Sequence, residues 1–159
     1  MPMGKNISCL VVIIVFLSFV GACTSTNLNV KPIAKSENPT DHINRLENDL
    51  ATAYKNQVNV LSPTWFAKAE SSLNQAKKLL DQGEELSKVL DNIAEGKAQL
   101  QKAEEVTRVT RTTMADTIKS RNLARQAGAA KLGDDYIDAE EAFLSLTKAI
   151  EKGNKLSRE

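Results

Sequence analysis

The sequence predicts an all-α protein: an elongated antiparallel helical bundle with one long central helix, preceded by a cleaved leader and a disordered tether. From Asp41 onward, apolar residues recur every three or four positions, and Pro63 is the only proline. Aromatic residues make up 4% of the chain, so the core must be aliphatic and alanine-rich. We expect three parts, with boundaries at 1–22, 23–40 and 41–159.

The leader is defined by an apolar run over residues 10–20, behind a short polar start that carries Lys5. This layout is typical of a secretory signal peptide, whose apolar region is shorter than a membrane-spanning helix requires. A short N-terminal transmembrane anchor over residues 7–23 is the alternative.

Four residues follow the apolar run: Val20, Gly21, Ala22 and Cys23. They resemble the lipobox of bacterial lipoproteins, which implies cleavage after Ala22 and palmitate-type acyl chains on Cys23. Several acyl chains hold a protein firmly to a membrane, whereas one chain binds only marginally. Because Thr24 and not Asp follows the cysteine, the resemblance favours a lipid-anchored position on the periplasmic face of the outer membrane.

The tether comes next. Residues 24–40 show no periodicity and contain Pro32 and Pro39, which is typical of a linker. A flexible linker of this length spans roughly 20–25 Å on average.

Two helices are predicted before Gly83. The first is capped by Thr40 or Asp41, and we take Asn56 and Gln57 as too weak a signal to end it. The second is capped by Ser62, with Pro63 in its first turn, and ends at Gly83. Their apolar stripes are Ile43, Leu46, Leu50, Ala53 and Tyr54, then Phe66, Ala69, Leu73, Ala76 and Leu80.

The third predicted helix is the long one, because no proline interrupts the chain between Leu86 and the turn at 128–133. It could run for about 40 residues, or ~60 Å. Gly96 and Ala103 lie on its stripe and would allow a neighbouring backbone to come close. The threonine-rich stretch 107–113 is its weakest part, and we expect a bend there.

The last predicted helix is capped by Asp134 or Asp135 and closed by Gly153. Its stripe is Tyr136, Ala139, Phe143, Leu146 and Ile150. A shift of 70 positions overlays this helix on the second one: Phe66 on Tyr136, Ala69 and Glu70 on Ala139 and Glu140, Leu73 on Phe143, Leu80 on Ile150 and Gly83 on Gly153. We interpret this as an internal repeat, against the alternative that two amphipathic helices match by chance.

The lipobox cysteine, the polar tether and the run aromatic-x-x-Ala-Glu-x-x-Leu/Phe ending in Gly resemble the uncharacterised α-helical module of bacterial envelope lipoproteins. The resemblance covers residues 63–153, and residues 125–153 match best. In that family the module often precedes an OmpA-like peptidoglycan-binding domain. No such domain follows here, so this chain could also be the N-terminal part of a longer peptidoglycan-binding lipoprotein.

Charge and composition exclude several functions. Of the 21 basic residues, Lys5 leaves with the leader, so 20 basic residues balance 20 acidic ones. Zero net charge argues against a nucleic-acid binder. With one cysteine after processing and His42 as the single histidine, expected to be solvated, we predict no catalytic residues, no metal site, no cofactor and no enzyme activity.

Charge is distributed unevenly: residues 106–131 carry six basic side chains against one acid, whereas residues 134–151 carry six acids against one lysine. The simplest explanation is internal, with the acidic helix folding back beside the basic one. The alternative is an anionic envelope partner that contacts the basic stripe of Arg108, Arg111, Arg121 and Arg125.

Together these features predict a membrane-anchored structural or interaction lipoprotein that tethers or scaffolds an envelope component. Its expected partners are the membrane, through the acyl chains, and an envelope protein of unknown identity that could be associated with peptidoglycan. A homo-oligomer is also conceivable, since a long apolar stripe can be buried against its own copy. The rival function is an assembly accessory, in which helix pairs resembling tetratricopeptide repeats hold client segments in an apolar groove.

Overall fold

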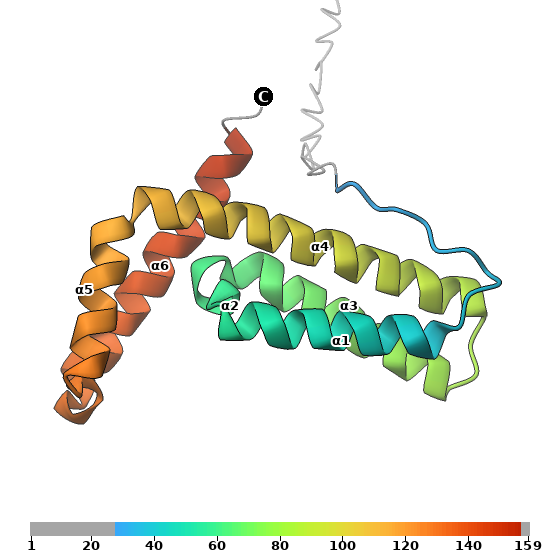
Figure 1. The fold of residues 1–159 in the computed structure, drawn as a ribbon, viewed down its shortest axis with the longest axis horizontal. Helices are drawn as coiled ribbons and strands as arrows, with labels where there is room; N and C mark the ends of the chain where they lie inside the picture. Colours follow the sequence, from blue (N-terminus) through green and yellow to red (C-terminus); the bar gives the residue numbers. More distant parts are fainter. Residues whose placement is uncertain (1–27, 157–159) are drawn as a thin grey trace, which may run out of the picture.

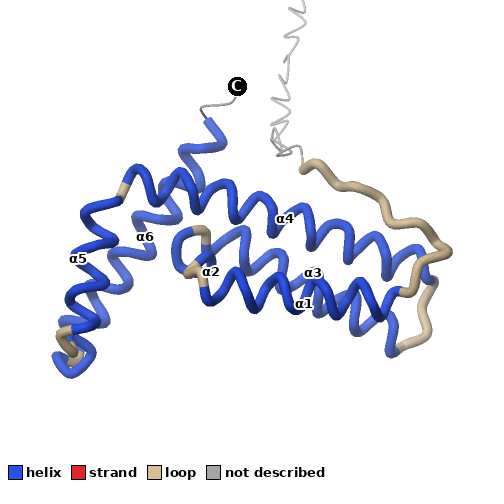
Figure 2. The backbone as a smooth tube through the Cα atoms, viewed as in Figure 1, coloured by secondary structure: helices blue, strands red, loops and turns tan. Residues whose placement is uncertain are grey.

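The computed structural model describes residues 28–156, and this part of the chain is all-α, without a strand. Helices α1, α3 and α4 lie side by side as a bundle, and α5 and α6 project from one end of it (Figures 1 and 2). We call residues 115–146 the arm. The elements are α1 (Pro39–Lys55), α2 (Val58–Leu61), α3 (Pro63–Asp81), α4 (Leu86–Thr113), α5 (Ala115–Gln126), the 3₁₀ helix η1 (Ala129–Leu132) and α6 (Asp134–Leu156).

The core of the bundle is aliphatic and lies between α1, α3 and α4. Leu46, Ala69 and Ile93, one from each helix, are fully buried. Removing apolar surface from water stabilises a fold by about 25 cal/mol per Å², so these stripes hold the three helices together. The predicted stripes of the first two helices are confirmed, except that Tyr54 remains 62% exposed.

Gly96 confirms the predicted close approach of a neighbouring helix. A Cβ atom at this position would lie 2.8 Å from a methyl carbon of Leu46 and 3.2 Å from the Cβ of Ser72. It would also lie 3.5 Å from the backbone oxygen of Ala69. Glycine therefore sets the spacing of α4 from both α1 and α3.

The segment before α1 corrects part of the predicted flexible tether over residues 23–40, of which residues 23–27 lie outside the described part of the chain. Residues 28–38, which we call the strap, run beside the bundle, and Leu28 and Ile33 pack against its core (Figure 1). The cap of α1 is Asn38, whose Oδ1 accepts a hydrogen bond from the Thr40 N–H at 3.0 Å. The predicted cap at Thr40 or Asp41 is therefore wrong, because Pro39 fits the first position of the helix.

Between α1 and α3 the chain makes a turn that the sequence did not predict. Helix α1 ends at Lys55, and Gln57 adopts a left-handed conformation with φ = 59°. Four residues then form α2, in which Val58 and Leu61 are buried. The Asn56–Gln57 pair does end the first helix, contrary to the prediction, because asparagine tolerates a helix terminus and α2 buries two aliphatic side chains.

The long third helix is in fact two helices. Helix α4 covers 28 residues and ends at Thr113, and α5 adds 12 residues after a break at Met114. The break directly follows the threonine-rich stretch in which a bend was predicted. The Thr110 hydroxyl, which is buried, donates to the backbone oxygen of Leu61 at 3.0 Å. This bond fixes the end of α4 to the bundle just before the chain turns away.

Helix α6 differs from the prediction in its end and in its buried face. It continues through Gly153 to Leu156, so that glycine does not close it. Phe143 is buried as predicted, but Ala139 is exposed and Leu146 is 53% exposed. The buried face also contains Thr147 and Glu151. The face is rotated because polar groups elsewhere in the chain bind side chains of α6.

Candidate interaction site

The residues predicted to carry the anchor lie outside the described part of the chain. These are the lipid-attachment residue Cys23 and the cleavage residues Val20, Gly21 and Ala22. Their roles stay predictions. Within residues 28–156, no helix has both the length and the apolar character needed to cross a membrane.

The four predicted contact arginines differ in their surroundings. Arg121 is nearly buried, with 10% of its side chain exposed, and Arg111 donates to the backbone oxygen of Asn56 at 2.6 Å. Arg108 and Arg125 are exposed. The structure therefore does not bring the four guanidinium groups together as one outward surface, and only the side chains of Arg108 and Arg125 make no hydrogen bond to another described residue.

Arg121 links α5 to α6 through Glu140. Its Nε lies 2.9 Å from Glu140 Oε1 and its Nη2 lies 2.5 Å from Oε2, the two-pronged arrangement that makes arginine–carboxylate pairs strong. The guanidinium carbon also lies 4.9 Å from the ring centre of Phe143. A further hydrogen bond of 3.3 Å reaches Gln57, in the turn before α2. Arg121 thus links the two helices of the arm to each other and to the turn before α2.

The surroundings of Glu140 favour its ionised form. Partial burial on its own would raise the pKa of Glu140, but the hydrogen bonds and positive charge of Arg121 outweigh it, so the pKa is lowered. Tyr136, through a hydrogen bond, and Arg125, through its charge, lower this pKa further. The internal explanation of the charge pattern therefore holds for Arg121 and Glu140.

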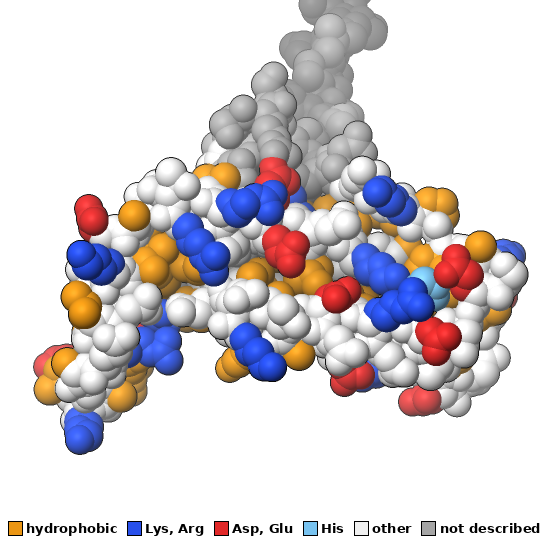
Figure 3. Space-filling model, in the orientation of Figure 1, with side chains coloured by type: hydrophobic (Ala, Val, Ile, Leu, Met, Phe, Trp, Pro, Cys, Tyr) orange, Lys and Arg blue, Asp and Glu red, His pale blue; other side chains and the backbone are white. Residues whose placement is uncertain are grey.

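The rest of the arm is weakly buried. Helix α5 has no buried side chain, and no Cα atom of α5 lies within 8 Å of one in α6. Figure 3 shows hydrophobic side chains among lysines and arginines along this part of the molecule. The large apolar side chains that are more than half exposed on the arm are Leu123, Leu132, Ile137 and Leu146.

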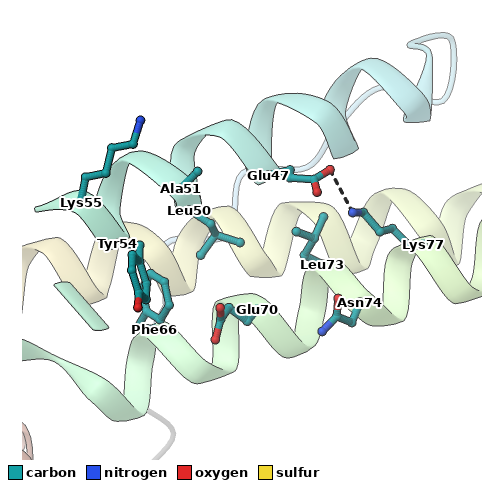
Figure 4. Close-up of a pocket in the computed structure, with 10 residues that line it drawn as sticks. All are labelled: Glu47, Leu50, Ala51, Tyr54, Lys55, Phe66, Glu70, Leu73, Asn74 and Lys77. Carbon is teal, nitrogen blue, oxygen red and sulfur yellow. Dashed lines mark ion pairs between the residues drawn. The ribbon is translucent and has the colours of Figure 1, made fainter. Parts of the chain in front are cut away.

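A groove of about 500 Å³ lies between α1 and α3 (Figure 4). Its floor is apolar, with Leu50, Phe66 and Leu73 buried. The exposed Tyr54 ring pairs with Phe66, with ring centres 6.5 Å apart. The polar rim consists of Glu47, Lys55, Glu70, Asn74 and Lys77. Glu47 and Lys77 form an ion pair of 2.9 Å across the groove.

His42 joins the strap to the bundle and corrects the prediction that it is solvated, since only 8% of it is exposed. Its Nε2 lies 2.6 Å from a carboxylate oxygen of Glu37, and its Nδ1 lies 2.8 Å from the Nζ of Lys97. A neutral ring fits both contacts, with Nε2–H donating to Glu37 and Nδ1 accepting from Lys97. Burial, reinforced by the charge of Arg45, lowers the pKa of Lys97.

Glu151 is a second site that the sequence reasoning missed. Its carboxylate, in a side chain only 4% exposed, lies at the N-terminus of α3. It accepts hydrogen bonds from the Ser62 hydroxyl at 2.7 Å and from the backbone N–H groups of Thr64 and Trp65 at 3.1 and 3.2 Å. Ser62 stands at the cap position as predicted, but its side chain caps nothing in its own helix. The N-terminus of α3 is capped by Glu151 instead, which lies 87 residues beyond Thr64 in the sequence.

No group of three or more His, Cys, Asp or Glu side chains in residues 28–156 is arranged to hold a metal ion. No family of proteins, no curated protein and no solved structure matches this chain.

Proposed function

We propose that this chain is a lipoprotein, anchored by acyl chains on Cys23 to the periplasmic face of the outer membrane, whose helical body tethers or scaffolds another envelope component. The lipobox-like residues that end at Cys23 support the anchor. The arm supports the interaction role, because α5 buries none of its side chains. An isolated 12-residue helix is marginal in water, so such a helix gains stability when a partner covers it.

In this proposal the body contributes contact surfaces and not a reaction. The Glu37–His42–Lys97 contacts are the nearest approach to an acid–base cluster in the described part of the chain. They join the strap, α1 and α4, so we assign them the task of fastening the strap. The apolar side chains of the arm and the exposed Arg108 and Arg125 are the groups we assign to partner contact.

The anchor is tested by replacing Cys23 with serine in the cell. We expect the variant to accumulate as an unprocessed precursor that incorporates no labelled palmitate, because serine cannot form the thioether to the lipid. The matched control is Ser25→Ala, two residues away, which should mature normally. Normal maturation and membrane attachment of Cys23→Ser would overturn the lipoprotein assignment.

The arm is tested by crosslinking in the cell from single photoreactive residues. We expect crosslinks to one envelope protein from positions 125 and 132 on the arm, and none from position 91 on the bundle. Position 121 is unsuitable, since Arg121 holds the arm in place. The Arg108→Glu, Arg125→Glu double variant should lose the crosslink from position 132 and keep its thermal stability if the partner surface is anionic. Equal crosslinking from all positions would contradict a defined arm surface.

The assembly-accessory function stays a second candidate because of one observation, the groove between α1 and α3. Its apolar floor and exposed Tyr54 are features that bind segments of other proteins. Binding of a hydrophobic dye to the folded chain, lost on Tyr54→Ser and Leu50→Ser, would favour this function over simple tethering.

A further inference from the structure

The sequence similarity between α3 and α6 does not extend to their packing. Helix α3 buries Ala69 and Ala76 in the bundle, where the backbone of Ala69 approaches Gly96 of α4. The equivalent residues of α6, Ala139 and Leu146, are exposed. The two helices therefore share one buried position, Leu73 in α3 and Phe143 in α6, but differ on either side of it: Ala69 and Ala76 are buried only in α3, and Thr147 and Glu151 only in α6.

Helix α6 shows what its covered face binds. Glu140 and Phe143 on this face hold the guanidinium of Arg121, through two hydrogen bonds to the carboxylate and a contact with the aromatic ring. The arginine is presented by a separate helix, α5. The face thus accepts an arginine side chain that another helix presents.

The same face of α3 forms one wall of the groove, with Glu70 exposed at the rim and Leu73 buried in the floor. Glu70 stands where Glu140 stands in the repeat, and Leu73 stands where Phe143 stands. The aromatic ring that Leu73 lacks is supplied by the exposed Tyr54 of α1, which lines the groove together with Glu70 (Figure 4). The parts that bind Arg121 in the arm are therefore present in the groove.

The charges of the groove also leave Glu70 available. Glu47 and Lys77 neutralise each other in their ion pair. Lys55 is directed away from Glu70 in Figure 4. Glu70 itself makes no ion pair and no side-chain hydrogen bond with any described residue. An apolar floor beside an unpaired carboxylate suits a long side chain with a cationic end.

We propose that the groove between α1 and α3 is a docking site for a partner helix that presents an arginine, with Glu70 as its ion-pair acceptor and Tyr54 as its stacking surface. This deepens the proposed function by giving the chemistry of a partner. Arginine is favoured over lysine because its planar fork binds a carboxylate at two points and stacks on an aromatic ring. The aliphatic part of the arginine would lie on Leu50 and Leu73.

The test uses residues 24–159, which contain every described helix, and a helix-stabilised peptide with the sequence of residues 115–126. Titration is followed by amide NMR shifts, and we expect the largest changes within 47–55 and 66–77. Glu70→Gln should weaken binding about three- to tenfold, and so should a peptide with glutamine in place of its central arginine. Glu104→Gln, on an exposed part of α4, is the matched control and should bind as the parent does.

Several results separate the alternatives. The proposal is overturned if the affinity for the peptide is unchanged by Glu70→Gln, or if it is unchanged when the peptide lacks its central arginine. So do shifts confined to α6, which would mean that the peptide replaces α5 on Glu140. Self-association that needs Glu70, seen without peptide, supports the proposal and identifies a second copy as the source of the helix. None of these results depends on Cys23, so the proposed anchor stands or fails separately.

Discussion

Replacing Glu151 with alanine is expected to detach the end of α6 from the N-terminus of α3. The native carboxylate accepts from one hydroxyl and two backbone N–H groups, all within 3.2 Å. It also places a negative charge at the positive end of the α3 dipole, where such a charge is favourable. The alanine variant would leave the Trp65 N–H, which is buried, without its acceptor.

The magnitude follows from these contacts. A hydrogen bond to a charged group contributes about 1.5–3 kcal/mol, and loss of a helix cap costs about 1 kcal/mol. In the alanine variant, water can reach the partly buried Thr64 N–H and restore part of the lost hydrogen-bond energy. We therefore expect Glu151→Ala to lower the free energy of unfolding by about 2–4 kcal/mol, and Tm by roughly 10 °C for a domain of this size. Glu151→Gln keeps one acceptor oxygen and should cost about half as much.

Urea denaturation followed by circular dichroism measures the free energy of unfolding. The fluorescence of Trp65, the only tryptophan, reports directly on this end of α3. Glu141→Ala, on the exposed side of the same helix, is the control and should change stability by less than about 0.5 kcal/mol. Equal losses for Glu141→Ala and Glu151→Ala would refute the assignment of Glu151 as the cap of α3.

Three further predictions concern packing and charge. Gly96→Ala should destabilise the bundle by about 1–3 kcal/mol in thermal unfolding, because the new methyl group meets Leu46. A Cβ atom at Gly153 has nothing within 4 Å, so Gly153→Ala should stabilise α6 by up to about 1 kcal/mol. A change of the same sign in both variants would be inconsistent with close packing at Gly96. Thr107→Val should be neutral or stabilising by about 1 kcal/mol in urea denaturation, since the buried hydroxyl has no hydrogen-bond partner among the described residues; a clear loss would show that the hydroxyl is bonded. The pKa of Glu140 is lowered in the fold, so its pairing with Arg121 stabilises the protein above the unfolded pKa of about 4.3, and this stabilisation is lost as pH falls through the folded pKa. The difference in unfolding free energy between the parent and Glu140→Gln should therefore shrink over that pH range. A difference that does not depend on pH down to 2 would contradict the pairing.

The helices of the bundle could be predicted because each buries a stripe that repeats every three or four residues. Leu46, Ile93 and Gly96 all lie where this periodicity places them. The same reasoning predicted a bend near 107–113, and the chain breaks at Met114. Periodicity reports on which face of a helix is apolar, and in α1, α3 and α4 the apolar face is the buried one.

Helix α6 could not be predicted in this way, because polar contacts decide which of its faces is buried. Glu140 and Glu151 turn inward for Arg121 and for the N-terminus of α3, which are 19 and 87 residues away in sequence. No local pattern marks a glutamate as the cap of a distant helix. His42 is a similar case, since its burial depends on Lys97, 55 residues further along the chain.

The packed strap sets how far the helical body could stray from the lipid bilayer. Leu28 already contacts the core, and only four residues lie between it and Cys23. The five steps from Cα to Cα can span at most about 18 Å, less than the thickness of the hydrocarbon core of a bilayer. If residue 23 carries the acyl chains, the part of the bundle that Leu28 contacts stays within that radius of the headgroups, so the helical body stays close to the bilayer surface.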